Sequence, residues 1–165
     1  MNIIQILKSD HREIKILCNE ILKAKAHAKR IRQKLFRHLG ELLNAHVKPE
    51  EQVVYEQLKE VPELKSRILE MFEEHHVVDL LLTELLALPI DDEHWIAKLA
   101  ILRETLLNHI EIEENEVFPE MRRYLSQEEM RRMADAFFAK RGRGGTNISH
   151  WGFSKNLKQT QWYHL

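Results

Sequence analysis

The chain has one cysteine, almost no glycine before its C-terminal end, and no long apolar run. Because Cys18 is the single cysteine among 165 residues, no intramolecular disulfide can form, which favours a reducing cytoplasm. The apolar runs are short and carry charges such as Asp79 and Glu84, which excludes a transmembrane helix. The N-terminus lacks a basic start and soon meets charged residues, so we expect no signal peptide.

Net charge is also nearly absent. Lysine and arginine number 25 against 26 aspartates and glutamates, so nothing draws the whole chain toward nucleic acid or an anionic membrane. The length and a hydrophobic content of 44% are enough for one domain with its own core. What the chain does have is ten histidines, more than its size leads us to expect, and their positions are informative.

Apolar residues recur at three- and four-residue steps along most of the chain, which indicates helices. No alternating pattern typical of strands competes with them. Four long helices and a short fifth one are predicted over approximate ranges: 3–22, 28–59, 62–89, 92–118 and 126–140.

Local signals mark several helix ends. Pro62 suits the first turn of the third helix, and Asp91 or Asp92 can cap the fourth. Pro119 is expected to kink or end that fourth helix. "SQEE" at 126–129 is a capping box, which starts the short fifth helix.

The predicted fold is all-α, an up-down antiparallel four-helix bundle joined by short turns. Residues 1–125 form this bundle, 126–140 a short C-terminal helix, and 141–165 an irregular or flexible tail. The tail holds four of the five glycines and no acidic residue. Its arginines and aromatics could stack on RNA, but an extended end packed by Trp151 and Phe153 is favoured. The basic tail could also engage a protein partner.

The chain contains a repeat, which relates the histidines to one another. "LLNAHVKPEEQVVYEQL" aligns with "TLLNHIEIEENEVFPEM" 63 residues later, and "LKSDHREIKILCNEIL" aligns with "MFEEHHVVDLLLTELL" 64 residues later. The sequence therefore contains two copies of one helical hairpin. The alignments pair metal-ligating residue types: His11 with His75, His46 with His109, and Glu50 with Glu113.

This spacing predicts a metal site in the middle of the bundle. Residues four apart lie on one face of a helix, so each His-x-x-x-Glu pair can point the same way. Two hairpins packed about a pseudo-two-fold axis bring together four imidazoles and two carboxylates. Imidazole suits iron, zinc or copper and carboxylate suits harder cations, so a dinuclear centre is sensible. Buried without cations, the two carboxylates would each cost several kcal/mol, on the order of a buried unpaired charge.

The same motifs resemble the hemerythrin-like family, also called the HHE cation-binding family, whose domains bind non-haem di-iron. "DHREI", "HVKPEE", "EHHVV" and "HIEIEENEVFPEM" occur in this order, and the resemblance spans residues 3–125. It implies an up-down four-helix bundle with two iron ions and an oxo, hydroxo or water bridge. It also implies four terminal histidine ligands and two bridging glutamates: His11, His46, His75, His109, Glu50 and Glu113.

The sequence departs from the family pattern in three places. Oxygen-carrying members have another histidine where this chain has Asp79, which can ligate metal, hold a water or face solvent. One histidine fewer leaves more open positions, which favours redox chemistry or sensing over reversible O2 carriage. Pro49 interrupts the first His-x-x-x-Glu pair and is expected to kink its helix. Glu56 stands where the second repeat has Pro119.

Other residues near the motifs have plainer interpretations. Glu51 and Glu114 also repeat, and either hydrogen-bond to the ligands or face solvent. Cys18 is expected to be a small core residue, and Tyr55 and Phe118 to be packing aromatics. Six histidines have no repeat partner and are assigned to the surface or core: His27, His38, His76, His94, His150 and His164.

Several functions fit this sequence. The first is a di-iron protein that binds O2, NO or peroxide as a sensor, store or scavenger. The second is an enzyme or iron donor in the nitric oxide or oxidative stress response or in iron–sulfur cluster repair. Repair-type relatives tend to carry an extra cysteine-bearing N-terminal domain, which counts against that reading here. The third is a binding module whose metal sets its stability, and the fourth is a bundle without metal.

Overall fold

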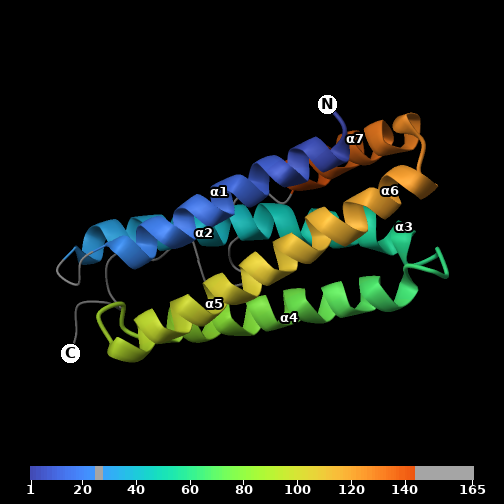
Figure 1. The fold of residues 1–165 in the computed structure, drawn as a ribbon. Helices are drawn as coiled ribbons and strands as arrows, with labels where there is room; N and C mark the ends of the chain where they lie inside the picture. Colours follow the sequence, from blue (N-terminus) through green and yellow to red (C-terminus); the bar gives the residue numbers. More distant parts are fainter. Residues whose placement is uncertain (25–27, 144–165) are drawn as a thin grey trace.

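The computed structural model describes residues 1–24 and 28–143, and all of its regular elements are helical (Figure 1). Four long helical stretches alternate in direction, which confirms the all-α up-down bundle. The predicted tail at 141–165 lies outside the described residues from 144 onward, and residues 25–27, between the first two predicted helices, also lie outside them. No helix within the described ranges is long and apolar enough to cross a membrane.

The first hairpin begins with α1 (Ile3–Lys23). Its capping box joins Asn2 and Gln5, since Oδ1 of Asn2 accepts from the backbone N–H of Gln5 at 3.1 Å and Oε1 of Gln5 accepts from that of Asn2 at 2.9 Å. The return stretch is continuous but changes its winding. It consists of α2 (Lys29–Glu50), the π-helix η1 (Glu51–Tyr55) and α3 (Glu56–Leu58).

The second hairpin repeats this plan. It consists of α4 (Lys65–Ala87), α5 (Glu93–Ile112), the π-helix η2 (Glu113–Val117) and α6 (Phe118–Tyr124). The side chain of Asp92 caps α5 by accepting from the backbone N–H of His94 at 2.7 Å, as one of the two predicted caps.

Two prolines of this hairpin, Pro62 and Pro119, do not mark the helix ends as predicted. Pro62 precedes α4, because the carbonyl of Val61 binds the N–H groups of Leu64 and Lys65 and closes a turn there. Pro119 does not end the fourth stretch. It lies in the first turn of α6, which continues directly from η2.

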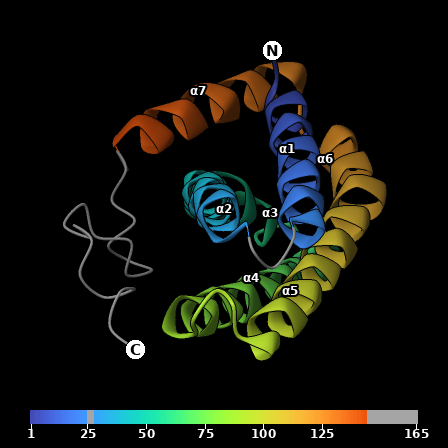
Figure 2. The same cartoon turned by 90° about the vertical axis from the view of Figure 1, so that its left-hand side faces the viewer.

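A fifth helix, α7 (Gln127–Arg143), follows the bundle and runs past the predicted end at Lys140. The predicted capping box is confirmed: Oγ of Ser126 accepts from the backbone N–H of Glu129 at 3.2 Å, and Oε2 of Glu129 accepts from that of Ser126 at 2.7 Å. α7 packs on α1, α2 and η1. Figure 2 shows it across the α1 and α2 side of the bundle, away from α4.

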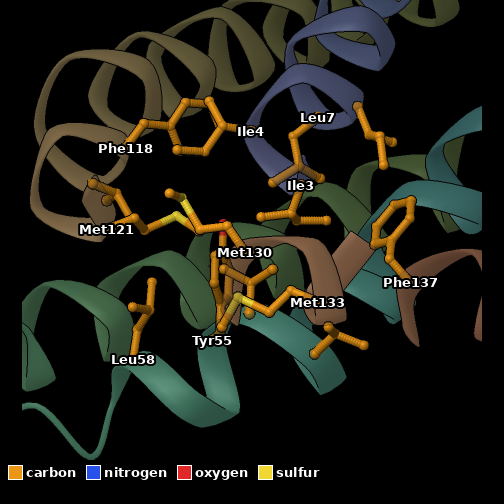
Figure 3. Close-up of a cluster of buried hydrophobic side chains, with 14 of the residues drawn as sticks. Ile3, Ile4, Leu7, Tyr55, Leu58, Phe118, Met121, Met130, Met133 and Phe137 are labelled. Atoms are coloured by element: carbon orange, nitrogen blue, oxygen red, sulfur yellow. The ribbon is translucent and has the colours of Figure 1, made fainter. Parts of the chain in front are cut away.

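Two apolar clusters fill the bundle. One lies toward the α4–α5 turn and contains Trp95, whose indole N–H donates to the carbonyl of Leu85 at 3.0 Å. The other lies at the α7 end, where Figure 3 shows Met130, Met133 and Phe137 in the same cluster as residues of α1 and η1. The space between the two clusters is where the predicted ligands lie.

Candidate metal centre

The six predicted ligands are all buried in the middle of the bundle. On α1, His11 lies between Leu7 of one cluster and Ile14 of the other, and the other three long stretches place their histidines in the same way. The side chains of Glu50 and Glu113 are 0% exposed. The apolar residues of each helix thus place its histidine between the two clusters, at the same height in the bundle. The six residues are His11, His46, Glu50, His75, His109 and Glu113.

Two groups of three side chains have the arrangement needed to hold metal ions. His11, His46 and Glu50 form one group, and Glu50, His75 and His109 form the other, with the ligand atoms of each group within 4.8 Å of one another. Oε2 of Glu50 lies 3.4 Å from Nε2 of His46 and 3.6 Å from Nε2 of His75. Glu50 therefore belongs to both groups and stands between them.

Glu113 faces the same centre from the second hairpin. Its Oε2 lies 3.2 Å from Nε2 of His11. Its Oε1 accepts a hydrogen bond from the hydroxyl of Tyr55 at 3.0 Å. That hydroxyl also lies 3.4 Å from Nε2 of His109, so Glu113 is linked to both hairpins.

Each of the four histidines has a carboxylate at its Nδ1 atom, which leaves Nε2 for the centre. The pairs come from different helices and follow the repeat. Asp10 and Glu74 contact the histidines of the two His-x-x-x-Glu motifs. Glu114 contacts the histidine of α1, and Glu51 contacts that of α4. The Nδ1–carboxylate distances are 3.1 Å for His46–Asp10, 2.7 Å for His109–Glu74, 3.1 Å for His75–Glu51 and 2.9 Å for His11–Glu114.

This arrangement decides between the two interpretations of the repeated acidic residues. Glu51 and Glu114 do not simply face solvent, because each meets a histidine ring. A carboxylate at the far nitrogen fixes the tautomer and orientation of a ligating imidazole. The side chains of Asp10 and Glu74 do the same, which the sequence pattern showed only as acidic residues preceding the histidines.

The two repeated aromatics also lie against the centre. The ring of Tyr55 stacks on His75 with centroids 5.3 Å apart, and that of Phe118 stacks on His11 at 5.9 Å. Packing was predicted for both. The hydrogen bond from the Tyr55 hydroxyl to Glu113 was not predicted, and by it the two halves of the centre differ by one hydroxyl group.

The π-helices account for that omission. A π-turn places residues five apart, rather than four, on one face. η1 follows Glu50 directly and brings Tyr55 round to the inner face, and η2 does the same for Phe118 after Ile112. The expected disturbance near Pro49 is thus a π-helix that starts two residues later. π-turns are frequent at functional sites.

Glu50 and Glu113 create an unfavourable concentration of negative charge. Burial and the charge of Glu113 raise the pKa of Glu50 well above its ordinary value. Burial opposes ionisation of Glu113 too, but its contact with His11 and the charge of His109 hold its pKa below the ordinary value. Two carboxylates this close are both ionised only when positive charge lies between them.

The histidines respond to their surroundings in different ways. Burial lowers the pKa of His46 and takes that of His75 to about 4, so both rings stay neutral and able to bind a cation. Burial would also lower the pKa of His11, but the carboxylates of Glu113 and Glu114 raise it.

Unpartnered polar atoms at the centre indicate that a cation fits there. Among the described residues, Nε2 of His11, both carboxylate oxygens of Glu50 and Oε2 of Glu113 are buried without a hydrogen-bond partner. Buried polar atoms without a partner are rare in proteins unless a ligand, ion or water molecule binds them. Nitrogen and oxygen donors together suit a first-row transition metal.

The remaining candidates lie elsewhere. Asp79 is half-buried and belongs to neither group of metal-holding side chains. His38, His76 and His94 are exposed, as assigned, while His27, His150 and His164 fall outside the described residues. Cys18 is 1% exposed among apolar neighbours, which confirms its place in the core.

Comparison with known proteins agrees with this geometry. A crystal structure of a hemerythrin HHE cation-binding domain-containing protein from Mycobacterium kansasii is similar to this chain. It is 24% identical, with a TM-score of 0.74, over 87% of this chain and 86% of that one. This likeness supports the fold. No curated protein matches significantly.

The family model named hemerythrin HHE cation binding domain matches residues 2–121. This range includes all six predicted ligands and the four carboxylates at their Nδ1 atoms, and it ends before α7 begins. The chain belongs to the hemerythrin HHE cation-binding domain family.

Proposed function

We propose that this protein holds two non-haem iron ions and binds or senses O2 or a related small ligand, NO or peroxide, in the cytoplasm. The observation that carries the proposal is the position of Glu50, which stands between two groups of histidines and belongs to both. Glu113 faces it, and in the described part of the chain both oxygens of Glu50 and one oxygen of Glu113 are buried without a hydrogen-bond partner.

The donor set assigns a role to each residue. His11 and His46 would hold one iron and His75 and His109 the other, with Glu50 and Glu113 between them. Two histidines and the two shared carboxylates would leave each ion with open positions for a small ligand. Imidazole and carboxylate together are typical ligands of iron in helical bundles.

Bound iron would supply a redox-active centre with affinity for small diatomic ligands and peroxide. The chain itself provides orientation and exclusion of water. The four carboxylates at the Nδ1 atoms hold the imidazoles in place, and the Tyr55 hydroxyl holds Glu113. The apolar clusters on either side keep bulk water from the centre.

Metal analysis tests the site. We expect about two iron ions per chain in protein purified without chelators, as a dinuclear bundle site requires. Glu50→Ala and Glu113→Ala should each lose most of the iron, because each removes a carboxylate that faces both metal positions. Glu111→Ala changes an exposed glutamate on the same helical stretch as Glu113 and should retain the iron. A fully folded wild-type protein without bound metal would contradict the proposal.

Ligand binding separates the functions that share this site. An iron-to-ligand absorption band that shifts on addition of azide would indicate an open position at the metal. Rapid mixing with O2, NO and peroxide then distinguishes a stable adduct, as a sensor or store forms, from turnover. Turnover would favour the alternative, an enzyme or iron donor in the nitric oxide or oxidative stress response or in iron–sulfur repair.

A further inference from the structure

Arg141, near the C-terminal end of α7, reaches the metal centre from outside the four-helix bundle. Its guanidinium meets the Asp10 carboxylate at two points: Nη2 donates to Oδ1 at 3.1 Å, and Nη1 lies 3.1 Å from Oδ2. Two-point contacts of this kind fix geometry as well as charge. Oδ2 of Asp10 is also the partner of Nδ1 of His46. A chain of contacts therefore runs from α7 to a metal-ligand candidate.

The packing of α7 holds Arg141 in this position. Its guanidinium carbon lies 5.7 Å from the centre of the Phe137 ring, one helical turn earlier. Phe137 is fully buried, and its ring centroid lies 6.5 Å from that of His46. The Arg141 side chain is 25% exposed, so most of it is covered.

The second half of the centre has no such cation. The repeat places Glu74 where the first hairpin has Asp10, and Oε2 of Glu74 lies 2.7 Å from Nδ1 of His109. Among the side chains that the structure describes, in 1–24 and 28–141, no lysine or arginine lies within ion-pair distance of Glu74. By contrast, the carboxylates of the other repeated pair both have lysine partners: Lys48 for Glu51, and Lys8 and Lys15 for Glu114.

We infer that Arg141 is a positioning residue for the metal ion held by His11 and His46, and that it makes the two metal positions unequal. The inference rests on the proposed function, since it requires two metal ions. By holding Asp10, Arg141 fixes the ring of His46 so that Nε2 faces Glu50. In the other position, the carboxylates at the Nδ1 atoms are Glu51 for His75 and Glu74 for His109, and neither of them meets Arg141.

Stepwise metal binding tests this directly. Metal-free full-length protein is titrated with Co²⁺ against a competing chelator, and the two dissociation constants are read from the cobalt absorption bands. Arg141→Met keeps the aliphatic stem but removes the charge and the N–H donors. We expect it to weaken one of the two constants by about 10- to 100-fold, the usual effect of losing such a partner, and to leave the other unchanged.

Two further variants serve as controls. Arg141→Lys keeps the charge but not the two-point contact and should restore part of the lost affinity. Arg131→Met removes an exposed arginine of the same helix, which pairs with Glu128, and should change neither constant. Equal weakening of both metal positions in Arg141→Met would mean that α7 acts only on the stability of the bundle, and would overturn the inference.

A double-mutant cycle asks whether Arg141 acts through Asp10. If it does, adding Arg141→Met to Asp10→Asn weakens metal binding little beyond Asp10→Asn alone. Fully additive losses would overturn the inference. In metal-free protein, ¹⁵N NMR of the imidazoles gives an independent readout. Arg141→Met should speed exchange of the His46 Nδ1 proton and leave that of His109 as it is.

The failure of this inference and that of the proposed function look different. A wild-type chain that binds fewer than two cobalt ions contradicts both. Two bound ions with the Arg141→Met constants unchanged contradict only the role of Arg141. An unchanged His46 ring proton in Arg141→Met also contradicts that role, without any metal being present.

Discussion

Each imidazole at the centre is held at Nδ1 and directs Nε2 toward the centre. Nδ1 meets a carboxylate from a neighbouring helix, and Nε2 faces Glu50, Glu113 or the other rings. Fixing Nδ1 as the donor leaves the Nε2 lone pair for a metal ion. The acidic residues beside the ligands therefore help to set how tightly a metal is bound.

Glu51→Ala tests this at one ligand. The Glu51 carboxylate meets Nδ1 of His75 at 3.1 Å, so its loss should weaken metal binding by about 10- to 100-fold without abolishing it. Glu50→Ala should have the larger effect, because Glu50 belongs to both groups. Chelator competition measures both, with Glu111→Ala as the exposed control. Stronger loss in Glu51→Ala than in Glu50→Ala would reverse the assigned roles.

His75 should make the metal-free protein sensitive to acid. Burial takes its pKa to about 4, against 6.5 for an exposed histidine. Between these values the unfolded chain binds the proton and the folded one does not, so stability falls as the pH falls through this window. The loss from about pH 7.5 to about pH 4.5 amounts to about 2–3 kcal/mol.

Urea unfolding of the metal-free protein at the two pH values measures this loss. His75→Gln removes the titrating group, so its stability should depend less on pH than that of the wild type by about the same 2–3 kcal/mol. Equal pH dependence in the two proteins would show that His75 does not contribute in the way its burial requires.

The sequence predicts the ligand candidates of the metal centre but not all of the contacts around them. The repeat brought all six ligand candidates together because helical spacing and register are readable without coordinates. Two contacts were not predicted: the hydrogen bond from the Tyr55 hydroxyl to Glu113 and the one from the Arg141 guanidinium to Asp10. Both depend on how separate elements meet in space, and neither Arg141 nor the Tyr55 hydroxyl has a counterpart in the repeat.

Among the elements, η1 and η2 bring Tyr55 and Phe118 against the metal centre, and α7 brings Arg141 to Asp10. η1 begins directly after Glu50 and η2 begins at Glu113, so each His-x-x-x-Glu pair ends where the α-helix changes to a π-helix. A four-residue periodicity predicts the pairs correctly and loses register just beyond them. The positions of the helices were therefore easier to predict than which side chains after residue 50 point into the bundle.

α7 should respond to its own cap. Ser126→Ala removes the hydroxyl that accepts from the backbone N–H of Glu129, and we expect a loss of about 1 kcal/mol in unfolding free energy. Hydrogen exchange of the α7 amides should speed up as the helix opens more often. Gln127→Ala changes the exposed first residue of α7 and should have little effect. Unaltered exchange in Ser126→Ala would show that the capping box does not stabilise α7.

At the scale of the whole molecule, two similar hairpins enclose one centre and a fifth helix makes its halves unequal. The up-down arrangement was predictable because short turns force neighbouring helices to run antiparallel. The side on which α7 packs was not, since a single capping box and its apolar residues fit several faces of a bundle. The apolar clusters above and below the ligands isolate the centre from solvent.

The central claim is that two metal ions share Glu50 in the middle of the bundle. Crystals of iron-loaded protein, measured at the iron absorption edge, give an anomalous difference map that tests it most directly. We expect two strong peaks, one beside His11 and His46 and the other beside His75 and His109, with the Glu50 carboxylate between them. A single peak, or peaks away from Glu50, would contradict it.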